Sequence, residues 1–240
     1  MIIAPSTLHG SPAIRPSNHL LAALPPETLV LLEPNLRQAN LRQGFVCYSA
    51  GDPIDQVYFP HTGMISRLVT IGDGNMVETS STGREGAVGL QCGFGPRLSY
   101  TQATVQTPGT FSSISAAHFE HVATGSQVLR ALIFDYMELL WAEAQQSSLC
   151  NAIHGASSRL CRWLLQCADR SGTEQLLLTQ QSLAEMLGVR RTTVTLLAQE
   201  LQKQGVVRYS RGRITILERA ALEAHACECY HAIKNVSLKN

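Results

Sequence analysis

The chain has 240 residues, and 45% of them are hydrophobic, so it is long enough to form two domains with separate cores. Its 19 basic and 18 acidic residues nearly cancel, so overall charge alone indicates no polyanionic partner. Seven scattered cysteines and the lack of an apolar run as long as a membrane span favour a cytoplasmic protein over a secreted or membrane protein.

The first half of the chain predicts a β domain. Residues 1–17 are rich in proline and serine and lack the features of a secretory signal, which predicts a flexible arm. A small apolar helix is expected over 18–32. Short β-type runs separated by glycines then follow to residue 119, among them FVCYS, QVYFP, MISRLVT and MVETS. This spacing is typical of a barrel or sandwich, and we assign 18–119 to a sensor domain.

A long helix is predicted next, from about residue 116 to 150. Apolar side chains recur in it at steps of 4, 3 and 4, at Leu129, Ile133, Tyr136 and Leu140. This spacing is typical of the seam of a two-stranded coiled coil and predicts a dimer interface. A helix packed on its own β domain is the alternative. A further helix at 156–170 is expected to turn Leu160, Trp163, Leu164 and Cys167 into the core of a C-terminal domain.

Residues 180–199 have the pattern of a helix-turn-helix, QQSLAEMLGVRRTTVTLLAQ. Two helices that cross closely need a small residue on the first, which Ala184 supplies. The turn needs a residue that tolerates left-handed backbone angles, here Gly188, and the second helix needs an aliphatic residue facing inward, here Val194. The start of the second helix, with its two arginines, is left open to DNA.

A β-hairpin is predicted directly after this motif. The runs VVRYS and RITIL alternate apolar and polar residues about the turn Arg211-Gly212, which is typical of the wing of a winged helix. Charge supports the same division, because residues 156–213 hold 9 basic against 4 acidic residues, whereas residues 1–155 hold 7 against 11. The basic charge therefore lies where DNA contact is expected.

The order of these elements, with YFPHTGMIS, GREGAVG, LTQQSLAEMLGVRRTTVT and RGRITIL, resembles the Crp/Fnr family of bacterial transcription regulators. The resemblance implies an α+β fold with a double-stranded β-helix (β-roll) of the cyclic-nucleotide-binding type at 18–119. A dimerisation helix at 120–152, a winged helix-turn-helix domain at 153–219 and a C-terminal tail at 220–240 would follow. It further implies a homodimer that binds a partly palindromic site in double-stranded DNA and recruits or blocks RNA polymerase.

The resemblance also implies roles for residues of the motif. Arg191 matches the arginine that family members use on a guanine, whose O6 and N7 suit the guanidinium fork. Where family members often have Glu and Arg, this chain has Thr192 and Leu196, so its DNA site is expected to differ. The predicted DNA-binding residues are Gln180, Gln181, Arg190, Arg191, Thr192, Thr193, Thr195, Arg208, Arg211 and Arg213.

The effector is left open by the sequence. Family members that bind cyclic nucleotides hold the ribose with a Glu after a Gly and the phosphate with an Arg-Ser pair, whereas this chain has Gly89-Leu90 and Thr101-Gln102. We therefore expect it not to be a standard cyclic-nucleotide responder. The candidate effector residues are Arg84, Glu85 and Arg97, although the first two also suit a turn-stabilising ion pair. A displaced cyclic-nucleotide pocket and a redox or metal response are the alternatives.

One dense group of metal-ligand residues lies near the C-terminus, in HACECYH: His225, Cys227, Cys229 and His231. In a continuous helix these would alternate between two faces, so we predict no metal site and no cofactor, although a bent tail would remove this objection. An iron-sulfur site near the N-terminus is not expected, since the first cysteine is Cys47. The sequence has no nucleophile-base pair or phosphate-binding loop that predicts an enzyme. The junction at His154-Gly155 is the expected hinge of the DNA-binding domain.

Overall fold

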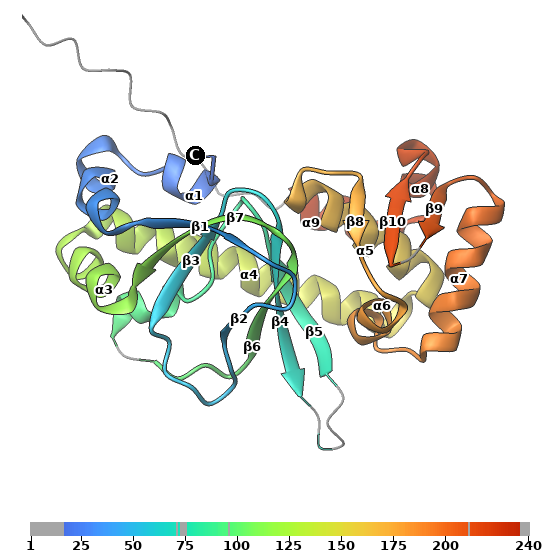
Figure 1. The fold of residues 1–240 in the computed structure, drawn as a ribbon, viewed down its shortest axis with the longest axis horizontal. Coiled ribbons are helices and arrows are strands. Elements are labelled where there is room, and N and C mark those ends of the chain that lie inside the picture. The colour runs from blue at the N-terminus through green and yellow to red at the C-terminus, as the bar shows by residue number, and fades with distance from the viewer. Residues whose placement is uncertain (1–16, 71, 73–75, 96, 211, 236–240) are drawn as a thin grey trace, which may run out of the picture.

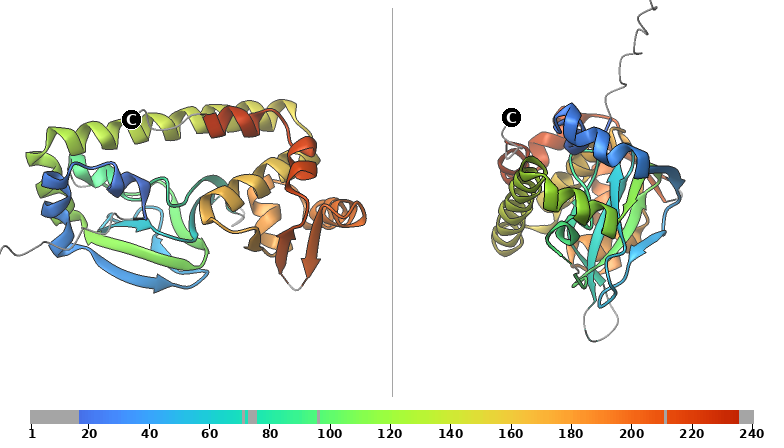
Figure 2. Two further views of the ribbon diagram at one scale, coloured as in Figure 1. Left: turned by 90° about the horizontal axis from the view of Figure 1, so that it is seen from above. Right: turned by 90° about the vertical axis from the view of Figure 1, so that its left-hand side faces the viewer.

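The computed structural model describes residues 17–70, 72, 76–95, 97–210 and 212–235, so the predicted N-terminal arm lies outside it except for Ser17. Figure 1 shows two lobes side by side, a β-rich lobe and a mostly helical one. Helix α4 (Gln127–Ile153) runs along both of them, as the first view of Figure 2 shows. Within the described residues, no helix combines the length and the apolar character needed to cross a membrane.

The β lobe is built from two antiparallel sheets that face each other. Their strand orders are β2-β6-β4-β5 and β1-β7-β3. The strands are β1 (Arg37–Leu41), β2 (Val46–Tyr48), β3 (Gln56–Pro60), β4 (Met64–Thr70), β5 (Met76–Thr82), β6 (Gln102–Thr107) and β7 (Gly109–Ser115). Phe59, Ile65, Val105 and Phe111 fill the space between the sheets. The predicted β-roll is confirmed, and the runs QVYFP and MISRLVT correspond to β3 and β4.

Short helices close the ends of this lobe. They are α1 (His19–Ala22), α2 (Pro26–Leu32), the 3-10 helices η1 (Glu33–Asn35) and η2 (Leu90–Phe94), and α3 (Ala116–Gly125). The long helix expected from residue 116 is interrupted at Ser126, whose backbone is extended. The Ser126 hydroxyl accepts a hydrogen bond from the backbone N–H of Leu129 at 3.1 Å and so begins α4 as a new helix.

The prediction of a dimer seam at Leu129, Ile133 and Tyr136 is wrong. All three side chains are 0% exposed in the single chain, because they pack into the core of its own β-roll. Leu140 packs against the same core and is partly buried. The ring of Tyr136 lies so close to Gly86 that any side chain there would overlap it. This face instead fits the alternative, a helix packed on its own β domain. A 4-3-4 spacing predicts an apolar stripe on a helix, but it does not say whether the stripe packs on the same chain or on a second copy.

The second lobe is a winged helix-turn-helix domain extended by two helices. Its elements are α5 (Ala156–Ser171), β8 (Gln175–Leu177), α6 (Gln180–Leu187), α7 (Arg191–Lys203), β9 (Val207–Ser210), β10 (Arg213–Ile216), α8 (Arg219–His225) and α9 (Cys229–Asn235). The strands form one antiparallel sheet in the order β8-β10-β9. Leu160, Trp163, Leu164 and Cys167 lie in its core, as predicted. Leu222 and Tyr230 from the tail share that core, so 219–235 are packed as part of this lobe.

Candidate nucleic-acid interface

The two helices of the motif meet as their sequence predicts. The Thr179 hydroxyl accepts a hydrogen bond from the backbone N–H of Ser182 at 3.0 Å and begins α6. Gly188 ends that helix at a φ of 61°, in the left-handed region that favours glycine. Ala184 is 6% exposed and Val194 is 0% exposed, so the small and the aliphatic residue both lie inside the motif. The helix-turn-helix is therefore confirmed.

The N-terminus of α7 presents the predicted basic residues to solvent. Arg190 precedes the helix and Arg191 is its first residue, and both are exposed, as is Thr192. The side-chain oxygen of Gln180 on α6 accepts a hydrogen bond from Nε of Arg191 at 3.3 Å. Both helices thus contribute to one surface, and this contact orients the Arg191 guanidinium without burying it.

The remaining predicted residues on these helices are partly engaged. Thr193 and Thr195 are half-buried, and the Thr195 hydroxyl donates to the backbone oxygen of Arg191 at 3.1 Å. Gln181 is exposed and donates to Glu185 at 2.9 Å. With its hydroxyl bonded inward, Thr195 has a methyl group left for apolar contact, which suits a thymine methyl.

The predicted wing is formed by β9 and β10. Arg208 pairs across the strands with Thr215, and Ser210 pairs with Arg213. These four side chains line one shallow surface, while Val207, Ile214 and Ile216 on the opposite face are buried. A hydrogen bond of 2.9 Å from the backbone N–H of Tyr209 to Gln202 ties the wing to α7. Arg211, in the turn, lies outside the described residues.

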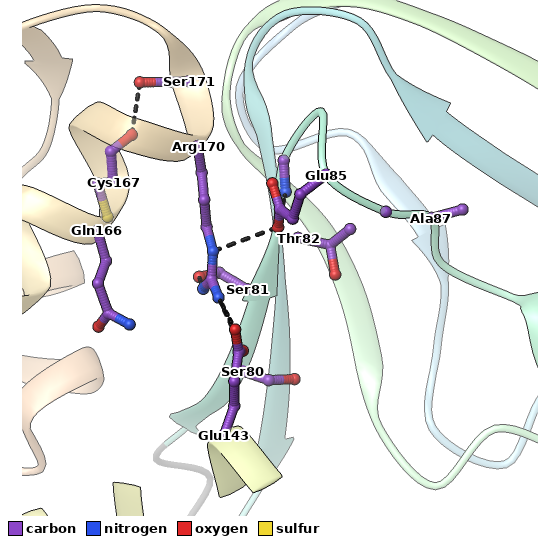
Figure 3. Close-up of polar contacts among 12 residues, drawn as sticks. Ser80, Ser81, Thr82, Glu85, Ala87, Glu143, Gln166, Cys167, Arg170 and Ser171 are labelled. Atoms are coloured by element: carbon purple, nitrogen blue, oxygen red, sulfur yellow. Dashed lines mark hydrogen bonds and ion pairs between the residues drawn. The ribbon is translucent and has the colours of Figure 1, made fainter. Parts of the chain in front are cut away.

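A buried ion cluster joins this lobe to the β-roll. Arg170, near the end of α5, donates through Nη2 to both carboxylate oxygens of Glu143 on α4, at 2.8 and 2.7 Å. Its Nε lies 3.3 Å from a carboxylate oxygen of Glu85, and its Nη1 donates to Ser81 at the end of β5 (Figure 3). The Arg170 side chain is only 11% exposed. The sequence did not predict this cluster, because its members are far apart along the chain.

This cluster bears on the candidate effector residues. Glu85 is one of its two acidic members. It therefore has the structural role that was the alternative to effector binding, an ion pair that stabilises the turn. Its partner in that pair is Arg170 and not Arg84. Arg84 is exposed, and its backbone oxygen accepts a hydrogen bond from His19 at 2.7 Å. Arg97 is exposed and donates to the backbone oxygen of Phe94 at 2.9 Å. The three candidates thus make separate contacts.

The C-terminal cysteines do not lie on a continuous helix. Helix α8 ends at His225 and α9 begins at Cys229, so the chain bends between them, and the objection to a metal site does not hold. Cys227 and Cys229 lie beside Cys150 and His154 from the end of α4. His225 and His231, the other two candidates, are not part of this group.

The chain is similar to known proteins in both sequence and structure. Residues 158–225 match the Crp-like helix-turn-helix domain. The CRP-like cAMP-activated global transcriptional regulator of Mycobacterium tuberculosis is 24% identical, with 84% of this chain and 93% of that protein covered. FixK2 from Bradyrhizobium japonicum has a similar structure, with a TM-score of 0.68 at 17% identity over 80% of this chain and 98% of that one.

A second solved structure is similar to the chain to the same degree. A CRP/FNR-family transcriptional regulator from Thermus thermophilus has a TM-score of 0.65 at 21% identity, covering 79% of this chain and 98% of that one. At such identities a structural likeness establishes the fold. The chain therefore has the fold of these regulators, with a β-roll, a long helix and a C-terminal domain in which residues 158–225 match the Crp-like helix-turn-helix domain.

Proposed function

We propose that the protein is a homodimeric transcription regulator that acts in the bacterial cytoplasm on a partly palindromic promoter site. The observation that carries this proposal is the exposed N-terminus of α7, with Arg190, Arg191 and Thr192, beside a wing that exposes Arg208 and Arg213. In a helix-turn-helix the second helix enters the major groove and its N-terminal residues contact base edges. Two copies related by a two-fold axis would read half-sites about 34–36 Å apart.

The residues of this surface divide into two roles. We assign Arg191 to a guanine, with Thr192 and Thr195 beside it at base edges and Thr193 at their flank. Gln180, Gln181, Arg190 and the wing arginines at 208, 211 and 213 are assigned to backbone phosphates, which fix position and affinity but carry no base sequence. We propose that the bound dimer regulates transcription through contact with RNA polymerase.

The dimer seam is proposed to lie on an exposed face of α4, beside the face that packs on the β-roll. Phe134, Met137 and Trp141 are 56%, 41% and 68% exposed there, although all three are large and apolar. Ala144 and Ser148 continue the same stripe, so the steps are 3, 4, 3 and 4. This is the heptad spacing of a two-stranded coiled coil, and small residues at its end let two helices approach closely. We define Phe134, Met137, Trp141, Ala144 and Ser148 as the outer seam.

We further propose that the effector is not a cyclic nucleotide held in the standard way. The Mycobacterium tuberculosis relative is described as cAMP-activated. This chain, however, has Leu90 and Thr101-Gln102 where an acidic residue and an Arg-Ser pair would be needed, and Glu85 is engaged by Arg170. A buried cyclic phosphate would therefore lack its main cation. We expect cAMP and cGMP to leave the DNA affinity unchanged in a fluorescence anisotropy titration. A tenfold or larger change would support the displaced pocket.

The DNA site itself is to be obtained by selecting bound fragments from a genomic library with the full-length protein. On the selected site, Arg191→Ala is expected to weaken binding by about 1–3 kcal/mol per half-site, which is about 5- to 150-fold, because a bidentate contact to guanine is lost. Arg42→Ala, an exposed arginine of the β lobe, is the matched control and should leave the affinity unchanged. Unchanged site-specific affinity of the Arg191 variant would overturn the assignment of this residue.

A further inference from the structure

Three cysteines and a histidine meet where the long helix ends. Cys150 lies in the last turn of α4 and His154 directly follows that helix, while Cys227 lies in the bend after α8 and Cys229 is the first residue of α9. Their ligand atoms, three Sγ and one imidazole nitrogen, all lie within 4.8 Å of one another. The two cysteines of the tail are 77 residues or more away in sequence from Cys150. The fold therefore assembles this group from two distant segments.

The three thiols are not filling a hydrophobic core. Cys150, Cys227 and Cys229 are 0%, 6% and 0% exposed, and they form a buried cluster of their own, separate from the cores of both lobes. By contrast, Cys161 and Cys167 pack among the aliphatic and aromatic side chains of the winged domain. A buried cysteine usually packs as a small apolar side chain. Here three cysteines face one another and an imidazole, which indicates a role other than packing.

The spacing of the group fits a single tetrahedral ion. The Sγ atoms of Cys150 and Cys227 lie 3.5 Å apart, and Sγ of Cys229 lies 3.6 Å from Nδ1 of His154. Zinc bonds of about 2.3 Å to sulfur and about 2.0–2.1 Å to nitrogen place neighbouring tetrahedral ligands about 3.5–3.8 Å apart. A disulfide would need sulfurs at about 2.05 Å, and the four residues are too close together to surround a cluster of several irons.

Groups around the four residues orient them as metal ligands. Nε2 of His154 lies 3.2 Å from a carboxylate oxygen of Glu228, so the second ring nitrogen, Nδ1, is the one that faces Cys229. A carboxylate on the far nitrogen of a ligating histidine is the usual outer partner in zinc sites. The amide nitrogen of Gln146 donates to Sγ of Cys229 at 3.1 Å, which stabilises a thiolate there. We propose that Cys150, His154, Cys227 and Cys229 bind one divalent metal ion of the zinc class.

The place of the site suggests what the ion does. Two ligands end the long helix, and the next residue, Gly155, begins the first helix of the DNA-binding lobe. The other two belong to the last segment of that lobe, and α9 lies along α4 in Figure 2. A bound ion would tie the end of the DNA-binding lobe to the long helix at the hinge. Regulation of DNA binding by the ion rests on the proposed function, whereas metal binding does not.

The test uses the full-length protein, purified under reducing conditions and loaded with Zn²⁺ or Co²⁺. We expect one ion per chain by mass spectrometry of metals, and a cobalt spectrum with sulfur charge-transfer bands and the strong visible bands of tetrahedral coordination. Cys150→Ser and Cys229→Ser should each lose this spectrum. Cys47→Ser, in the β lobe, is the control and should keep it. Glu228→Gln, which changes no ligand, should weaken zinc affinity by about 10- to 100-fold.

Several outcomes would overturn the assignment. These are less than half an equivalent of ion in the loaded wild-type protein, a cobalt spectrum typical of octahedral coordination, or an unchanged spectrum in both cysteine variants. A non-reduced mass two hydrogens lower without bound metal would indicate a disulfide instead. Should the serine variants not fold, the wild-type cobalt spectrum and the Glu228 variant decide the matter. Because Arg191 is tested on DNA separately, failure of the metal site and failure of DNA recognition are distinguishable.

Discussion

Replacement of Arg170 by methionine is expected to lower the free energy of unfolding by about 3–5 kcal/mol, because removal of one partner leaves buried charge uncompensated. The side chain of Glu143 is 11% exposed and loses both of its hydrogen bonds to the guanidinium, while Glu85, 29% exposed, loses its ion pair. Methionine keeps the apolar stem of arginine and lacks only its guanidinium end, so the effect reports the loss of the charged group. Urea denaturation followed by circular dichroism at neutral pH measures it.

A second substitution separates lost charge from lost packing. In the double variant Arg170→Met with Glu143→Gln, the more buried of the two carboxylates in the cluster is replaced by a neutral amide. We therefore expect the double variant to regain more than half of the stability that the single variant loses. Arg42→Met, at an exposed site, is the control, and its free energy of unfolding should lie within about 0.5 kcal/mol of that of the wild-type protein. A single Arg170 variant as stable as the wild type would show that the cluster contributes nothing to stability.

Introducing a negative charge at Trp141 is expected to separate the proposed dimer. In a parallel seam each Trp141 lies against the same residue of the second copy, so Trp141→Glu removes two large rings and opposes two like charges. Loss of a central aromatic contact costs at least about 2 kcal/mol, so we expect the dissociation constant to rise by at least about 30-fold. Sedimentation equilibrium over a range of concentrations measures it, and affinity for a palindromic site should fall in parallel.

The same helix offers a matched control. Val128 is 50% exposed, yet its position on α4 is far around the helix from the outer seam. Val128→Glu should therefore leave the dimer intact, whereas both variants should keep the wild-type circular dichroism spectrum. A Trp141 variant that remains dimeric at the concentrations where the wild type does would place the interface elsewhere and refute the outer seam.

Most of the fold could be predicted from local patterns in the sequence. The strands at 56–60 and 64–70 follow from their alternation and flanking glycines, and Ala184, Gly188 and Val194 define the motif through short-range sterics alone. The long helix shows where this reasoning stops. It has two apolar stripes of similar spacing, and only the packed structure reveals that the stripe with Leu129 faces the β-roll while the one with Trp141 faces water.

Contacts between distant segments were beyond the sequence for a different reason. Neither the position of Arg170 on its helix nor that of Glu143 indicates that they meet, since no periodic rule relates residues on separate elements. Likewise, the objection to a metal site applies only if the tail cysteines lie on one helix, whereas the bend at residues 226–228 places them beside Cys150 and His154. Sites assembled from two segments need the tertiary structure to become visible.

The return of α9 to the end of α4 adds a second contact between the C-terminal lobe and the long helix, besides the pairing of Arg170 with Glu143. The covalent link at His154-Gly155 joins the same two parts of the chain. A body attached to its neighbour only by a covalent link turns freely, and each further contact removes directions in which it can turn. A large swing of α7 relative to the β-roll would therefore have to break the tail contact at Gln146 and Cys150, the ion pairs of Arg170, or both.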